Sequence, residues 1–185
     1  MSTLIYSMGV SADGRIAAAD RDIGWAAPDE ELHRFHNEQA RELGLHLLGR
    51  RLYEVMAYWE TAEERNPSAP EHQLEFARIW KALPKIVFSK TLETVEGDTR
   101  LSRGDPVEEV RALKEESRGD IAVGGAELAS TLTAHGLIDE YRLFVTPVVV
   151  GAGKPFFAGD TRMDLELVET RTFGSGVVYT RYRRA

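Results

Sequence analysis

Two adjacent glycines separate an apolar run from a helical pattern in the segment Asp120-Ile-Ala-Val-Gly124-Gly125-Ala126-Glu127. Glycines let a backbone approach a ligand closely, and the free N–H groups of a helix start, with the helix dipole behind them, attract an anion. The segment is therefore a candidate phosphate site. The alternative is a tight connection between a strand and a helix, which is the more common use of a Gly-Gly pair.

Two other apolar runs are also followed directly by residues that suit a phosphate. Gly49-Arg50-Arg51 follows one of these runs, and Ser89-Lys90-Thr91 follows the other. Ligands of open α/β sheets bind beyond the carboxyl ends of the strands. Neighbouring strands would therefore gather two guanidinium groups, two hydroxyls and an ammonium beside a helix start. Such a cluster favours the 2′-phosphate of NADPH over the bare ribose of NADH. Taken singly, each cation could instead be a solvated surface charge.

Length and composition limit the class of protein. With 185 residues, 43% hydrophobic and 29% charged, the chain suits a single compact domain over residues 1–185. A net charge of −7 argues against nucleic-acid binding, and the absence of cysteine excludes disulfides and thiolate chemistry. We find no signal peptide and no stretch of membrane-spanning length, so we expect a cytoplasmic protein that binds no membrane.

Three other kinds of chemistry fail on inspection. His33 and His36 lie three apart without further ligands, so we expect no metal site. The segment Gly151-Ala-Gly153-Lys154 lacks the first glycine and the hydroxyl residue of an ATP phosphate loop. No Gly-x-Ser-x-Gly motif supplies a hydrolase nucleophile.

The elements that must position these residues alternate between short apolar runs and helical patterns, which predicts a largely parallel α/β sheet. The predicted strands are Leu4 to Val10, His46 to Leu48, Lys85 to Phe88, Ile121 to Val123, Tyr141 to Val150, Leu165 to Phe173 and Val177 to Tyr182. The predicted helices are Pro28 to Leu43, Arg51 to Trp59, His72 to Leu83, Pro106 to Ser117 and Glu127 to His135. The last strands have no helix between them, and Gly174-Ser175-Gly176 suits a hairpin turn, so we expect antiparallel pairing there. Residues 61–70 are expected to form an exposed loop.

Five motifs in order resemble one family. They are Ser11-Ala-Asp13-Gly14-Arg-Ile16-Ala, Leu48-Gly49-Arg50-Arg51-Leu52, Val87-Phe-Ser89-Lys90-Thr91-Leu, Gly124-Gly125 with Leu128, and Asp139-Glu140 followed by Pro147 and Gly151-Ala-Gly153-Lys-Pro-Phe-Phe. Over nearly its whole length the chain resembles the dihydrofolate-reductase-like family that includes the reductase domain of the bifunctional riboflavin-biosynthesis deaminase/reductase (RibD C-terminal type).

The resemblance implies a three-layer α/β fold with a mainly parallel eight-stranded sheet, a C-terminal antiparallel hairpin and NADPH as the cofactor. It implies that Gly49, Arg50 and Arg51 hold the adenosine side and its phosphates, with Ser89 and Lys90 near the 2′-phosphate. It also implies that Gly124, Gly125, Ala126 and Glu127 receive the pyrophosphate, and that the backbone of Ile16 borders the nicotinamide. Many relatives have Thr or Ser where this chain has Leu52, so one hydroxyl to the cofactor phosphates would be missing.

On the substrate side, the resemblance implies that the loop of Ser11, Asp13 and Gly14 contacts cofactor and substrate. Asp13 could equally be a turn residue, and Trp25, a candidate wall of a flat-ring pocket, could be a core aromatic. Dihydrofolate reductases place a carboxylate on the first helix, which alignment matches to Glu30 or Glu31. Since a helix turns about 100° per residue, only one of the two can face a cleft. Acidic residues also suit the first turn of any helix.

The residues and the resemblance together predict an NADPH-dependent oxidoreductase that transfers hydride to a small nitrogen heterocycle. The closest activity is that of 5-amino-6-(5-phosphoribosylamino)uracil reductase of riboflavin biosynthesis, here expected as a stand-alone domain. The alternatives are a dihydrofolate or pterin reductase and a non-catalytic NADPH-binding module. We expect a homodimer formed by the strand from Tyr141 to Val150 and the terminal hairpin.

Overall fold

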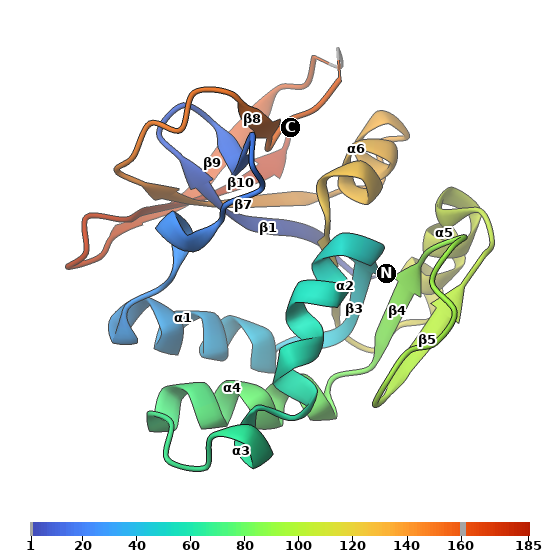
Figure 1. Cartoon of the computed structure of the whole chain (residues 1–185). Helices are drawn as coiled ribbons and strands as arrows, with labels where there is room; N and C mark the ends of the chain where they lie inside the picture. The colour runs from blue at the N-terminus through green and yellow to red at the C-terminus, as the bar shows by residue number, and fades with distance from the viewer. Residues whose placement is uncertain (1, 160–161) are drawn as a thin grey trace.

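Eight strands form one sheet in the order β5-β4-β3-β6-β1-β7-β10-β9 in the computed structural model, which describes residues 2–159 and 162–185 (Figure 1). The strands are β1 (Leu4–Ser11), β3 (Leu43–Gly49), β4 (Lys85–Phe88), β5 (Thr99–Ser102), β6 (Asp120–Gly124), β7 (Glu140–Thr146), β9 (Leu165–Thr172) and β10 (Val178–Arg184). Neighbours from β5 to β7 pair in parallel, whereas β10 pairs antiparallel with both β7 and β9. The predicted fold class, a mainly parallel eight-stranded sheet with a C-terminal antiparallel hairpin, is confirmed.

A second, small sheet joins β2 (Arg15–Ala18) to β8 (Gly153–Pro155) in antiparallel pairing. It links the loop after β1 to the segment after β7. Neither strand is predicted by the sequence pattern, and β5 is likewise absent from the predicted strands.

The helices agree with the predicted ones to within a few residues. They are α1 (Glu30–Arg41), α2 (Arg50–Met56), α3 (Ala62–Arg65), α4 (Glu71–Ala82), α5 (Pro106–Glu116) and α6 (Ala126–Ala134), with short 3₁₀ turns η1 (Gly24–Ala26) and η2 (Ala57–Glu60). Side-chain caps fix two starts: the Asp29 carboxylate accepts from the backbone N–H of Leu32 at 2.9 Å, and Asp105 caps α5 ahead of Pro106. The α3 turn lies inside the segment predicted as a loop. None of these helices is both long enough and apolar enough to cross a membrane.

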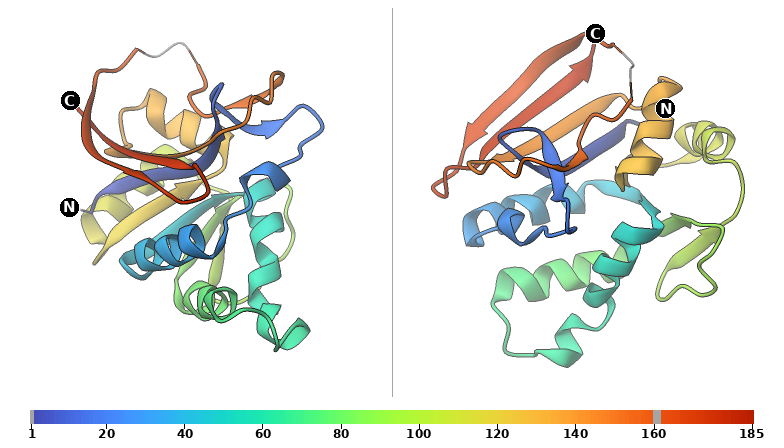
Figure 2. Two further views of the ribbon diagram at one scale, coloured as in Figure 1. Left: turned by 90° about the vertical axis from the view of Figure 1, so that its left-hand side faces the viewer. Right: turned by 45° about the horizontal axis from the view of Figure 1, so that its top comes forward.

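Helices cover both faces of the sheet (Figure 2). On one face, Tyr6 and Tyr141 belong to a large core that includes residues of α5 and α6. On the other face, Phe144 packs with Leu32 of α1, and Leu48 packs with residues of α2 and α4. Each layer buries apolar area that neither element could bury alone, and this burial is the main force that fixes the architecture.

Candidate active site

The three strand ends identified in the sequence lie side by side, because β4, β3 and β6 are neighbours in the sheet. The parallel register places Gly49 beside Phe88 and Leu48 beside Gly124. A cleft of about 680 Å³ opens over these ends, and we call it the outer cleft. The predicted cofactor residues that line it are Gly49, Arg50, Arg51, Ser89, Lys90, Gly125, Ala126 and Glu127.

Two predicted cofactor residues lie elsewhere. Gly124 lines a neighbouring cavity, and Ile16, on β2, is 8% exposed and packs in the core. The proposed contact of the Ile16 backbone with a nicotinamide therefore stays a prediction.

A glycine is required at position 125, where φ is +100°. A Cβ atom there would lie 3.3 Å from both Cα and N of Gly49, so the two loops could not approach as closely. Helix α6 begins at the next residue, and no side chain from its N-cap position accepts from its first turn. The backbone N–H groups at this helix start, beside Ala126, are thus available to an anion in the outer cleft.

The outer cleft is positive although the chain is negative overall. Its wall carries five cations and two carboxylates, namely Arg21, Arg50, Arg51, Lys90 and Lys154 with Glu54 and Glu127. The chain as a whole has a net charge of −7. Clustering of like charge against this background favours an anionic ligand in the cleft.

Ion pairs hold several of these cations at the rim. Arg50 donates from Nε to Glu54 at 2.7 Å and from Nη1 to the Thr91 hydroxyl at 2.6 Å. The Lys154 ammonium donates to Glu127 at 2.8 Å, and this bond lowers the pKa of the Glu127 carboxyl. Because these pairs are exposed, they contribute little to stability, and the cations can turn to a phosphate.

Lys154 was missed by the sequence reasoning as a site residue. It stands on the three-residue strand β8, which shows no periodic pattern, and its segment supports the family resemblance and fails as an ATP phosphate loop without indicating a role for the lysine. The signal in the sequence is the position of this lysine directly after Gly151-Ala-Gly153. Ser89, which was predicted, has a turn role as well, since its hydroxyl accepts from the N–H groups of Thr91 and Leu92.

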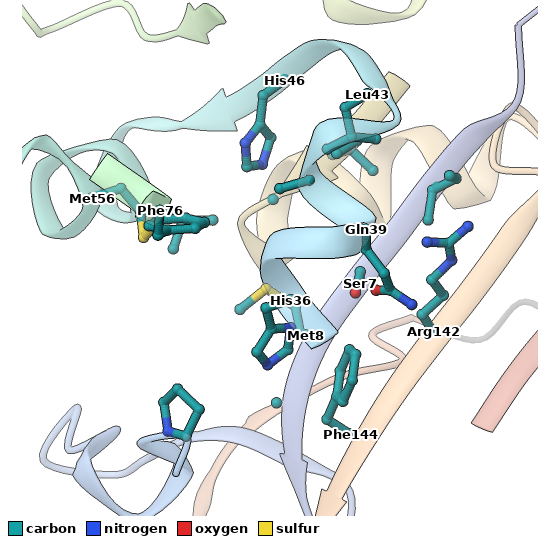
Figure 3. Close-up of a pocket in the computed structure, with 18 of the residues that line it drawn as sticks. Ser7, Met8, His36, Gln39, Leu43, His46, Met56, Phe76, Arg142 and Phe144 are labelled. Carbon is teal, nitrogen blue, oxygen red and sulfur yellow. The ribbon is translucent and has the colours of Figure 1, made fainter. Parts of the chain in front are cut away.

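A second cavity of about 360 Å³, the inner cavity, lies next to the outer cleft, and Leu52 lines both. Helix α1 and strands β1, β6 and β7 supply much of its wall. Most of its surface is apolar, with Met8, Met56, Phe76 and Phe144 among the lining residues (Figure 3). Such an apolar space beside a cationic cleft suits a flat organic ring.

Three histidines of the inner cavity are neutral at neutral pH. Burial lowers the pKa of His36 and of His46 to about 4, and burial also lowers the pKa of His33. Arg142 is the one charged residue among the described residues of this wall. Neutral imidazoles can donate or accept a hydrogen bond but are weak acids for proton transfer at pH 7.

None of the four predicted substrate residues lines either space. The hydroxyl of Ser11 donates to Asp13 at 2.6 Å, and Asp13 accepts from the N–H groups of Val150 and Gly151. These bonds, first the one from Ser11, lower the pKa of Asp13 to about 2. The β1–β2 loop is thereby fastened to the β7–β8 loop, which is the turn role that the sequence left open.

The other two predicted substrate residues, Gly14 and Trp25, also lie outside both spaces. Gly14 adopts φ +80° beside this clamp, and the Trp25 indole donates to the backbone oxygen of Asp22 at 3.1 Å. Substrate contact by any of the four therefore has no support from their positions.

Glu30 and Glu31 lie outside both spaces as well. Glu30 pairs with Arg34 at 2.8 Å, while Glu31 accepts from Arg171 at 3.1 Å and from the N–H of Gly174 at 3.0 Å. These partners lower the pKa of both carboxyls, so both are ionised at neutral pH. A catalytic role for either one remains a prediction that the placement does not favour.

Helix α1 instead presents His33, His36, Gln39 and Ala40 to the inner cavity. These positions form one stripe at helical spacing. The sequence predicts the helix but not this stripe, because nothing in its residue types separates a cavity wall from a core.

The sheet order, the terminal hairpin and the two adjoining spaces define an α/β protein with a dihydrofolate-reductase-like fold. Residues 2–179 match the sequence profile of the RibD C-terminal domain, and the chain belongs to this family. The members of this family with known activity are reductases, which places the chain among oxidoreductase-type domains.

Three relatives illustrate the similarity. The Bacillus subtilis (strain 168) protein YyaP, itself described as uncharacterized, is 32% identical over 181 residues, covering 97% of this chain and 93% of YyaP. A diaminohydroxyphosphoribosylaminopyrimidine deaminase/5-amino-6-(5-phosphoribosylamino)uracil reductase from Thermotoga maritima superposes with a TM-score of 0.69 at 17% identity, over 100% of this chain and 57% of that one. Dihydrofolate reductase from Enterococcus faecalis, complexed with NADP(H), superposes with a TM-score of 0.62 at 16% identity, over 98% and 96% of the two chains.

Proposed function

We propose that this chain is an NADPH-dependent reductase of a small nitrogen heterocycle, similar to 5-amino-6-(5-phosphoribosylamino)uracil reductase. The observation that carries the proposal is the convergence of three strand ends on a cationic cleft that adjoins an apolar cavity. A dinucleotide needs both environments, since its phosphates are anionic and its nicotinamide is a flat ring that must lie against the substrate.

The residues present fit this cofactor. Gly125 and Gly49 leave room for a backbone cradle, and the start of α6 offers free N–H groups beside it. In the proposal this helix start meets the pyrophosphate, while Arg50 and Lys90 meet the 2′-phosphate. The bound cofactor would supply a hydride, and the residues of the chain would position the acceptor.

The inner cavity would hold the heterocycle. Its wall is mostly apolar, and its neutral imidazoles can orient a ring through hydrogen bonds. Leu52, which lines both spaces, would separate the phosphate region from the ring region. Among the described residues of the wall no carboxylic acid is present, so in this proposal the proton comes from water.

A non-catalytic NADPH-binding module is the second candidate. The observation that favours it is that the described residues of the inner cavity wall include no carboxylic acid. The two candidates differ in turnover. Consumption of NADPH in the presence of pyrimidine or pterin acceptors supports a reductase, whereas tight binding without consumption by any acceptor supports the module.

Titration of the chain with NADPH and with NADH tests the cofactor assignment first. We expect NADPH to bind at least about tenfold more tightly, because one charge-assisted hydrogen bond to the 2′-phosphate is worth about 1.5–3 kcal/mol. The preference should shrink as salt is raised. Equal affinities for the two nucleotides would rule out the role given to the basic rim.

A further inference from the structure

Glu127, the second residue of α6, holds two cations of the outer cleft with one carboxylate oxygen. Its Oε1 accepts from the Lys154 ammonium at 2.8 Å and lies 3.6 Å from Nη1 of Arg51. Lys154 stands on β8 of the small sheet, whereas Arg51 stands on α2, which directly follows β3. The carboxylate therefore joins two cations from separate parts of the chain at the start of α6.

The start of α6 also offers backbone donors at this place. The first hydrogen bond of the helix runs from the N–H of Ala129 to the Gly125 carbonyl at 2.9 Å, so the N–H groups of the three residues between them have no partner in the helix. These three residues line the outer cleft, as do Arg51 and Lys154. Backbone donors and both cations thus face one space.

A phosphate at the helix start would compete with the Glu127 carboxylate for the two cations. Phosphate and carboxylate oxygens both accept charge-assisted hydrogen bonds from ammonium and guanidinium groups, and a carboxylate beside a bound anion also repels it. The Glu127 side chain is 79% exposed, so its ion pairs are weak and a ligand can open them at small cost. Glu127 should therefore reduce the affinity of the cleft for an anion without abolishing it.

We propose that Glu127 is an internal competitor of the ligand: its carboxylate occupies Lys154 and Arg51, and a pyrophosphate group must displace it from them to bind. The inference rests on the proposed function only in treating the outer cleft as the dinucleotide site. Glu127 then has two opposed roles, since its backbone N–H serves the phosphate and its carboxylate holds back the cations. The affinity for a dinucleotide is thereby kept below the value that the cations of the cleft would permit.

Calorimetric titration of the full chain with inorganic pyrophosphate, at one fixed ionic strength, tests the proposal. This probe carries the group assigned to the start of α6 and lacks the rest of the dinucleotide. We expect Glu127→Gln to bind pyrophosphate about three- to tenfold more tightly, because the substitution removes the negative charge and frees both cations. Unchanged or weaker binding by the variant, or no binding of pyrophosphate to either form, overturns the proposal.

Glu108 offers a matched control. Like Glu127, it lies in the first turn of its helix, is 74% exposed and pairs with a cation, Arg111, at 2.7 Å, but it does not line the outer cleft. Glu108→Gln makes the same change in net charge and should leave the pyrophosphate affinity within about 1.5-fold of the unaltered chain, because solvent and salt screen a distant exposed charge. An equal gain in the two variants would show a response to net charge alone and would also overturn the proposal.

A second substitution, Lys154→Met, shows whether Glu127 acts through the lysine. Alone it should weaken pyrophosphate binding about threefold or more, since one phosphate partner is lost. In the Lys154→Met background, Glu127→Gln should improve binding by about twofold or less, because the nearer of the two cations that the carboxylate occupied is gone. The same gain in both backgrounds would mean that Glu127 acts by repulsion alone and that the displacement is wrong.

NADPH titration of the same variants keeps failure of this inference apart from failure of the proposed function. If Glu127→Gln binds pyrophosphate more tightly and NADPH binds to neither form, the proposed reductase function fails and the competition stands. If NADPH binds to the unaltered chain and Glu127→Gln changes neither affinity, the competition is wrong and the proposed function is untouched.

Discussion

Arg50 is the residue on which the cofactor assignment can be tested most directly. Its guanidinium lies at the rim of the outer cleft and reaches Thr91 in the loop that follows β4. We expect Arg50→Ala to weaken NADPH binding about 10- to 100-fold and NADH binding less than about threefold, because only NADPH carries the 2′-phosphate. Calorimetric or fluorescence titration of both nucleotides measures this difference.

Arg34 supplies the matched control. Like Arg50, it is an exposed helical arginine paired with a glutamate four residues away, but it does not line the outer cleft. Arg34→Ala should leave both affinities unchanged. Equal losses for NADPH and NADH in Arg50→Ala would show that Arg50 acts on the fold or on a shared part of the nucleotide.

His46 makes the stability of the fold depend on pH in a defined window. Its pKa is about 4 in the folded chain and about 6.5 when unfolded, so below pH 6.5 the unfolded state binds the extra proton. The free energy of unfolding should therefore fall as the pH decreases from 6.5 to 4. Between pH 7 and pH 5, His46 should account for about 1–2 kcal/mol of this loss.

Urea denaturation at these two pH values checks the assignment. His46→Gln should show a smaller difference between pH 7 and pH 5, whereas His135→Gln, at an exposed position, should behave as the unaltered chain. An unchanged difference in His46→Gln would contradict the lowered pKa of this imidazole.

The basic and glycine residues of the outer cleft could be predicted from the sequence, while the inner cavity could not. Gly49-Arg50-Arg51 and Gly124-Gly125 both follow apolar runs that the pattern predicts as strands of one sheet, so they were informative together although neither was informative alone. By contrast His36, His46 and Phe144 are of types that also fill cores, and Arg142 sits within a strand pattern. Only three-dimensional packing distinguishes a cavity wall from a core.

At the scale of elements, the close contact between the start of α6 and the end of β3 depends on Gly125. We expect Gly125→Ala to lower the free energy of unfolding by about 2–4 kcal/mol, from an unfavourable positive φ and from overlap with Gly49. NADPH affinity should fall as well, because the proposed pyrophosphate cradle would widen. Thermal and urea unfolding, with titration of the cofactor, measure both effects.

Gly151→Ala separates the two causes of this destabilisation. Gly151 also has a positive φ, of +78°, but nothing lies within 4 Å of an added Cβ. It should cost only about 1–2 kcal/mol, which is the cost of the backbone conformation alone. Similar costs at both positions would mean that the approach of Gly125 to Gly49 carries no energetic weight.

Elements with strong periodicity were predictable, and the missed ones are short. Strands β2, β5 and β8 have three or four residues each, too few for an alternation to show. Three of the four residues of β5 are also polar, and as an edge strand it pairs with one neighbour only. Its existence follows from the tertiary pairing with β4, which local sequence does not encode.

At the scale of the whole molecule, the two edges of the sheet differ in what they expose. The β9 edge is exposed along nearly its whole length and carries Leu167, which is 54% exposed, and Val168, which is 43% exposed. Exposed apolar side chains on an edge strand favour association. We therefore propose that the homodimer contact lies at the terminal strands.

Sedimentation equilibrium tests this proposal, with an expected mass of twice the 20.7 kDa chain. Leu167→Lys should weaken the dimer at least about tenfold, because a lysine on an edge strand brings an unpaired charge into the contact. Val55→Lys is the control, since Val55 is comparably exposed, at 52%. It lies on α2, which follows β3 and is therefore far from the β9 edge. A single-chain mass for the unaltered protein at micromolar concentration would remove the dimer, and a loss of mass in Val55→Lys alone would move the contact to the α2 side.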